Sequence, residues 1–180
     1  MSGILVVCTG NICRSPMAEG FLRAAFVERL GEAAPVITSA GTAGWDGSGA
    51  MIESIRSAEE RGADIRTHLA RRLTPEMLDE ADLVVCMAAD HREAIVAARP
   101  DVEAKTFTIK GLVRLMEASP SGGLLDARLA AAAAARDGSS PPDEDIRDPL
   151  GDPIDGYREV ADELHDLAGR LVAALTEDPV

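Results

Sequence analysis

Residues 4–17 read ILVVCTGNICRSPM, a short apolar run followed by a polar loop and the start of a helix. Four consecutive apolar residues at 4–7 are typical of a strand buried on both faces of a parallel sheet. Ser15 can cap the helix that follows, and Pro16 suits its first turn, where the missing N–H loses no hydrogen bond. This strand–loop–helix unit predicts an α/β fold.

The rest of the chain repeats the alternation. Apolar or β-branched runs predict three further strands, at 36–40, 83–87 and 106–109. Apolar residues at helical spacing predict further helices, at 51–61, 74–80, 90–98 and 154–175. Alternating strands and helices indicate a three-layer sandwich of parallel strands with right-handed crossovers. A length of 180 residues fits a single domain spanning 1–180.

Residues 117–147 interrupt this rhythm. Residues 119–123 are loop-like, 124–136 predict an alanine-rich helix with little to bury, and 138–144 are rich in Ser, Pro and acids and are expected to be mobile. We interpret 117–147 as a surface insertion. A lid or docking arm beside a functional site is the alternative.

Composition excludes several classes of function. The formal net charge of -13 argues against binding to nucleic acid and against a role at a membrane surface, which both need a positive field. Three cysteines, an odd number, favour a reducing compartment, and no apolar run approaches the ~20 residues of a membrane span. We therefore expect a cytoplasmic protein. With three histidines and no ligand-spaced cluster, no metal or other cofactor is expected.

The loop from Cys8 to Arg14 carries the chemistry. Its backbone N–H groups and those of the following helix can converge on one point and bind an anion, with Gly10 allowing the turn. Arg14 offers a planar fork that matches two phosphate oxygens. The same positive field favours a thiolate at Cys8, a nucleophile in line with a bound phosphorus atom. A lone cysteine after a strand is usually inert packing, but this ordered combination rarely arises by chance.

Residues 7–19 resemble the N-terminal signature of the low-molecular-weight protein-tyrosine phosphatases. The similarity continues through residues 39–42, Trp45, residues 68–71, residues 81–87 and Asp148-Pro149. The resemblance implies a four-stranded parallel sheet flanked by helices, and a phosphatase that works through a phosphocysteine intermediate. It implies Cys8 as nucleophile, Arg14 as phosphate clamp and Asp148 as proton donor.

The resemblance also assigns the surrounding residues. It implies that the phosphate is held by loop residues, namely Thr9, Gly10, Asn11, Ile12, Cys13 and Ser15. Besides capping the helix, Ser15 is expected to form a hydrogen bond between its hydroxyl group and the Cys8 thiolate. Ser39 and His68 would brace the loop, and Trp45 would form a wall of the substrate slot, although filling the core is the usual fate of tryptophan.

Two assignments have competitors within the sequence. A second dipeptide, Asp152-Pro153, follows Asp148-Pro149 and is better read as the start of the last helix, but the residues alone leave Asp152 open as the acid. Cys13 either forms a reversible disulfide with Cys8 or only packs.

We expect the substrate to be a phosphotyrosine-containing protein or peptide, with inorganic phosphate as product. A protein-arginine phosphatase of the same family is the first alternative. That subgroup resembles this chain near Asp148 but is marked by threonine at the position of Ile12. An arsenate reductase would need a relay of two further cysteines, and Cys86 has no partner in residues 87–102. A phosphate-binding regulator without turnover would be expected to lack Cys8 or Asp148.

Overall fold

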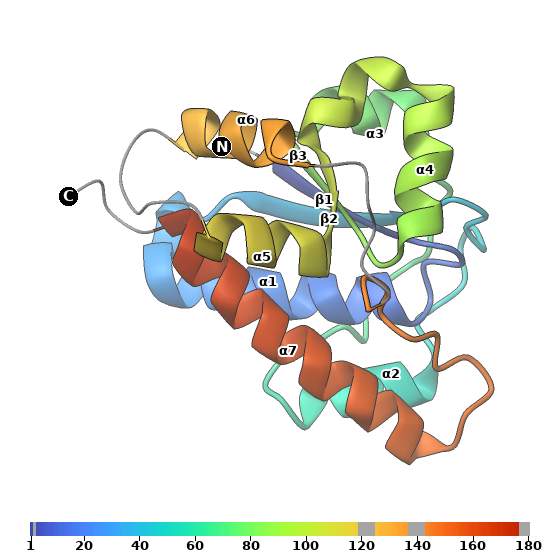
Figure 1. The fold of residues 1–180 in the computed structure, drawn as a ribbon. Helices are drawn as coiled ribbons and strands as arrows, with labels where there is room; N and C mark the ends of the chain where they lie inside the picture. The colour runs from blue at the N-terminus through green and yellow to red at the C-terminus, as the bar shows by residue number, and fades with distance from the viewer. Residues whose placement is uncertain (2, 119–124, 137–142, 177–180) are drawn as a thin grey trace.

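The fold centres on one parallel sheet. The computed structural model describes residues 1, 3–118, 125–136 and 143–176. The four strands lie in the order β2-β1-β3-β4 (Figure 1), with bounds β1 Gly3–Cys8, β2 Val36–Gly41, β3 Leu83–Cys86 and β4 Thr106–Thr108. Ile4 of β1 pairs with Ile37 on one side and with Leu83 on the other, all in parallel register. The predicted four-stranded parallel sheet is confirmed.

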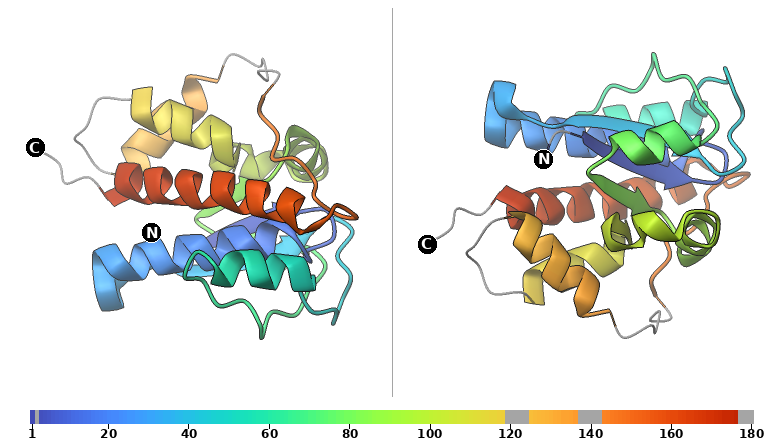
Figure 2. Two further views of the ribbon diagram at one scale, coloured as in Figure 1. Left: turned by 90° about the horizontal axis from the view of Figure 1, so that it is seen from below. Right: turned by 90° about the horizontal axis from the view of Figure 1, so that it is seen from above.

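Helices cover both faces of the sheet. Their bounds are α1 Arg14–Leu30, α2 Ile52–Glu59, α3 Pro75–Glu80, α4 Ala89–Ala98, α5 Ile109–Ala118, α6 Leu125–Ala134 and α7 Ile154–Thr176, with 3₁₀ turns at Gly31–Ala33 and Pro100–Lys105. Figure 2 shows α1, α2 and α7 together on one face, and α3 and α4 on the other. The arrangement is a three-layer sandwich.

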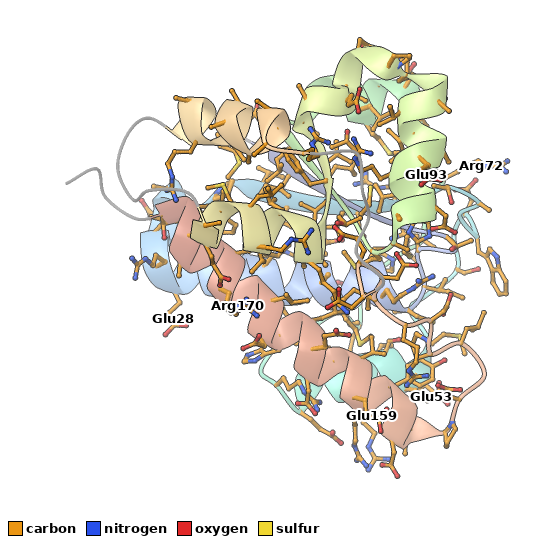
Figure 3. The ribbon with its side chains drawn as sticks, in the orientation of Figure 1. Glu28, Glu53, Arg72, Glu93, Glu159 and Arg170 are labelled. Atoms are coloured by element: carbon orange, nitrogen blue, oxygen red, sulfur yellow. The ribbon has the colours of Figure 1, made fainter. Side chains whose placement is uncertain are left out.

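The buried residues of β1 divide between two cores. Ile4 and Val6 belong to the larger core, with α1, α5 and α7, whereas Leu5 and Val7 belong to the smaller core with α3 and α4. Because successive side chains point to opposite faces, a continuous apolar run is what a doubly covered strand requires. Helix α7 buries most of its predicted apolar stripe, from Val160 to Leu175, in the larger core. Tyr157 packs in a separate cluster, and Glu159 and Arg170, labelled in Figure 3, are exposed on the helix.

The sequence reading missed one helix, α5. Strand β4 ends at Thr108 and α5 begins at the next residue, so no turn residues mark the boundary. Gly111 also lowers helix propensity. Ile109, Leu112 and Met116 are nevertheless buried in the larger core, and their spacing of three and four is the helical signal that the β-branched run concealed.

Part of 117–147 is described. The predicted helix at 124–136 is present as α6, which buries Ala132 in the larger core while Ala130, Ala131 and Ala134 are exposed. Residues 119–123 and 138–142 lie outside the described residues. Glu144, expected in a mobile stretch, is buried, where it accepts a hydrogen bond from Thr108 and pairs with Arg114.

Candidate active site

The Cys8–Arg14 loop lies at the carboxyl edge of the sheet, where β1 ends and α1 begins. Its left-handed residue is Asn11, with φ 58°, so the expectation that Gly10 supplies the special turn was wrong. Asparagine tolerates this conformation better than most residues. Gly10 instead leaves space: a Cβ there would stand 3.3 Å from Ile12 Cγ1 and 3.9 Å from Trp45 Nε1.

Two hydrogen-bond donors converge on the Cys8 sulfur. The Asn11 backbone N–H lies 3.3 Å from Cys8 Sγ, and Ser15 Oγ lies 2.9 Å from it. Ser15 Oγ already accepts a bond of 2.9 Å from Asn11 Nδ2, so its own hydrogen is free to point at the sulfur. Both contacts hold the Cys8 sulfur in a fixed position within the loop. The predicted capping role of Ser15 was wrong, because Cys13 is the N-cap and no side chain caps α1.

A polar network braces the loop from behind. Asn11 Nδ2 also donates to Ser39 Oγ at 2.8 Å, and Ser39 donates to Glu19 Oε2 at 2.6 Å. His68 Nε2 lies 2.8 Å from the Asn11 carbonyl oxygen, and the Arg71 backbone N–H donates to Asn11 Oδ1 at 2.9 Å. Ser39 and His68 thus both contact the left-handed Asn11, and their bracing role stays a prediction.

Arg14 joins the loop to the segment before α7. Its side chain is buried, and Nη1 donates to the Ile146 carbonyl oxygen at 3.1 Å. Nη2 donates to Thr9 Oγ1 at 3.3 Å and to Asp148 Oδ2 at 2.6 Å. One guanidinium therefore contacts both the loop and the candidate acid, which are far apart in the sequence.

The two candidate acids occupy different surroundings. The Asp148 side chain is 47% exposed and pairs with Arg14, and its Oδ1 accepts the Leu150 backbone N–H at 3.1 Å. Asp152 pairs instead with Arg147. The fold thus brings the Asp148 carboxylate to the loop, whereas Asp152 pairs with Arg147, outside the loop.

Trp45 and Ile12 lie beside Gly10 at the loop. Trp45 is 53% exposed, so the alternative that it fills the core was wrong. Its backbone N–H donates to the Gly10 carbonyl at 3.1 Å, which holds the indole next to the loop. Ile12 is buried with Cys13, Ala70 and Tyr157.

The three cysteines are free thiols in different settings. Cys13 Sγ lies 3.9 Å from Tyr157 Oη, and burial raises the pKa of Cys13 to about 11. Burial also raises the pKa of Cys86, a fully buried residue of β3. A thiol in such surroundings is a poor nucleophile. Cys86 is therefore unsuited to the outward relay of an arsenate reductase.

The sequence reading overlooked His91, in the first turn of α4. Its Nε2 lies 2.9 Å from Thr9 Oγ1, although 82 positions separate the two residues. The sequence carried no signal for this contact, because it depends on β1 and β3 being neighbours in the sheet, which brings the residues after each strand to one edge. No group of three or more His, Cys, Asp or Glu suited to a metal occurs among the described residues. Nor does any helix in the described ranges have the length and apolarity to cross a membrane.

Comparison with known proteins agrees with this site. Residues 3–119 match the low molecular weight phosphotyrosine protein phosphatase family. The chain belongs to this family. Its relatives carry two kinds of name. A protein-arginine-phosphatase of Geobacillus stearothermophilus is 34% identical over 96% of this chain and 95% of its own length. A probable low molecular weight protein-tyrosine-phosphatase, AmsI of Erwinia amylovora, is 38% identical over 59% of this chain and 70% of its own length.

Solved structures show the same fold. The low molecular weight protein tyrosine phosphatase from T. tengcongensis superposes with a TM-score of 0.74 and 35% identity, covering 96% of this chain and 98% of that one. The family is one of cysteine-dependent phosphatases, and the loop, the arginine and the carboxylate described above supply the groups that such chemistry uses.

Proposed function

We propose that this chain is a protein-arginine phosphatase that works through a phosphocysteine intermediate. The observation that carries the chemistry is the meeting of Cys8, Arg14 and Asp148 at one edge of the sheet. The relative named for phosphoarginine supports the substrate, since it matches nearly the whole chain, whereas the AmsI relative matches 59% of it. Three free thiols suit a reducing, cytoplasmic location.

The mechanism follows from the groups present. The Cys8 thiolate attacks phosphorus, the bond from phosphorus to the leaving nitrogen breaks, and Asp148 in its acid form protonates that nitrogen. Arg14 and the loop N–H groups stabilise the equatorial oxygens in the transition state. Asp148, now ionised, takes a proton from water as the water attacks phosphorus. The bond from sulfur to phosphorus breaks, and the Cys8 thiolate and inorganic phosphate are released.

Asp148 also supports a guanidinium leaving group. Its half-exposed carboxylate already binds one guanidinium, that of Arg14, at 2.6 Å. When phosphate takes over Arg14, the same carboxyl group lies free to meet the guanidinium of a phosphoarginine side chain. Planar guanidinium and carboxyl groups match in geometry.

Protein phosphotyrosine, the substrate expected from the sequence, is the second candidate. The observation that favours it is the apolar character of the loop edge, where Ile12 and the exposed Trp45 lie beside Gly10. A tryptophan face can stack on a phenol ring, a contact worth roughly 0.5–1.5 kcal/mol. Ile12 offers no hydroxyl to orient a water. The full-length likeness to the T. tengcongensis enzyme, which carries a tyrosine-phosphatase name, also favours this candidate.

Side-by-side kinetics separate the two candidates. We expect kcat/KM for a phosphoarginine peptide to exceed that for the matched phosphotyrosine peptide, and Ile12→Thr to widen the difference. Trp45→Ala should raise KM only for the aryl substrate. A wild-type enzyme faster on phosphotyrosine would reject the arginine proposal and leave the phosphatase chemistry standing. Failure to hydrolyse phosphoarginine, phosphotyrosine and para-nitrophenyl phosphate alike, without metal, would instead favour a phosphate-binding regulator.

A further inference from the structure

His91 is a buried histidine in contact with the phosphate-binding loop. It lies in the first turn of α4 and is 3% exposed, whereas Glu93, labelled on the same helix in Figure 3, is exposed. Its Nε2 lies 2.9 Å from Thr9 Oγ1. Thr9 Oγ1 in turn lies 3.3 Å from Arg14 Nη2. The Thr9 hydroxyl therefore stands between the imidazole and the phosphate clamp.

Donor and acceptor capacity limits the hydrogen bonds that Arg14, Thr9 and His91 can form with one another. A guanidinium can only donate, so Arg14 Nη2 donates to the Thr9 oxygen. The single hydrogen of that hydroxyl is then free to donate to His91 Nε2. For Nε2 to accept, the imidazole must be neutral and carry its proton on Nδ1. A hydroxyl oxygen has two lone pairs and can also accept from both Arg14 and an Nε2–H, so the order of donation from Arg14 to Thr9 to His91 is part of the proposal below.

The surroundings of His91 agree with a neutral ring. Burial lowers the pKa of His91, and the Arg14 charge lowers it further, against the opposing effect of Asp90 on α4 and of Asp145 and Asp148 before α7. Nδ1 is buried without a hydrogen-bond partner among the described residues, since Asp90 Oδ1 lies 3.7 Å away. A buried ring with one unpaired N–H persists more easily uncharged than charged.

We propose that His91 is a positioning residue that holds Arg14 ready for phosphate through the Thr9 hydroxyl. By accepting the Thr9 hydrogen, it keeps a lone pair of that oxygen turned toward Arg14 Nη2. Protonation of His91 would turn Nε2 into a donor and place two donors on the Thr9 oxygen, beside the Arg14 charge. The inference rests on phosphate binding at this loop, but not on whether the substrate is phosphoarginine or phosphotyrosine.

Phosphate binding by labelled protein tests the proposal without requiring turnover. Inorganic phosphate is titrated by NMR into wild type, His91→Gln and His91→Leu, with His165→Gln, an exposed histidine of α7, as the matched control. Glutamine keeps an acceptor, so we expect Kd within about threefold of wild type. Leucine removes the acceptor and should weaken binding roughly tenfold, the loss of one hydrogen bond in a charged network. Unchanged affinity in a folded His91→Leu would overturn the proposal.

Two further readouts distinguish positioning from packing. At pH 7.5 the imidazole ¹⁵N shifts of His91 should show the Nδ1–H tautomer, and an Nε2–H tautomer would overturn the assignment even if His91→Leu fails to fold. A double variant, Thr9→Val with His91→Leu, should bind phosphate no more weakly than Thr9→Val alone, and additive losses would refute the relay. Where turnover is measurable, the acid limb of kcat/KM should move in His91→Gln but not in His165→Gln. If phosphate binds in wild type but no substrate is hydrolysed, the catalytic proposal fails and this one stands.

Discussion

Replacing Asp148 by asparagine should separate its two roles at the loop. In this structure Asp148 Oδ2 forms an ion pair with Arg14 Nη2 at 2.6 Å, and Arg14 is the group that must bind a phosphate dianion. Asparagine keeps the shape and can still accept the Leu150 N–H, but it removes the negative charge and the transferable proton. We therefore expect Asp148→Asn to lose turnover while it gains affinity for inorganic phosphate.

The size of the gain follows from the exposure of the pair. The Arg14 side chain is 7% exposed and that of Asp148 is 47% exposed, so water screens the interaction from one side. Such a pair belongs at the upper end of the range for surface ion pairs, about 1 kcal/mol, which corresponds to roughly fivefold in an equilibrium constant. Phosphate should thus bind about two- to fivefold more tightly in Asp148→Asn. Loss of general acid catalysis should lower kcat by about 10²–10⁴, most for poor leaving groups.

The assay combines an NMR phosphate titration with kcat for aryl phosphates of graded leaving-group strength. Asp152→Asn is the matched control, since Asp152 pairs with Arg147 and should change neither quantity. Weaker phosphate binding by Asp148→Asn would refute the argument that Asp148 competes for Arg14. A steep leaving-group dependence in Asp152→Asn alone would show that the acid is Asp152.

Three further predictions concern the cysteines. Cys8→Ser should abolish hydrolysis of para-nitrophenyl phosphate while NMR still detects phosphate binding, and retained turnover would contradict the mechanism. If Cys13 attacks oxidised Cys8, mild peroxide should inactivate the enzyme reversibly through a disulfide found by peptide mapping, whereas Cys13→Ser should over-oxidise irreversibly. The raised pKa of Cys13 slows that attack, and absence of the bridge would leave Cys13 as a packing residue. Burial raises the pKa of Cys13 to about 11, so the folded state holds a proton that the unfolded state releases above about pH 9. Its contribution to stability, roughly 1–3 kcal/mol, is present below pH 9 and lost as pH rises toward 11. Urea unfolding should therefore show a smaller decline over that range in Cys13→Ala.

Local patterns determined most of the fold. The apolar run at 4–7 predicted a strand covered on both faces, and β1 is that strand, because a continuous apolar segment is stable only where helices cover both sides. The stripe over 154–175 predicted α7 nearly to the residue. Helix α5 was not predicted from the sequence because β4 leads directly into it without a turn. The helix forms because burial of its apolar residues outweighs the low helix propensity of Gly111.

The candidate site divides in the same way. The sequence predicted that Cys8, Arg14 and Ser15 lie together after a strand end, because residues close along the chain can adopt only a few relative positions. Which of the two carboxylates lies at the loop depended on the tertiary structure, which directs Asp148 to Arg14 and Asp152 to Arg147. His91 likewise meets Thr9 only because β1 and β3 are neighbours in the sheet. Contacts between residues far apart in the sequence depend on strand order and on side-chain direction. The spacing of residues along the chain predicts neither of these.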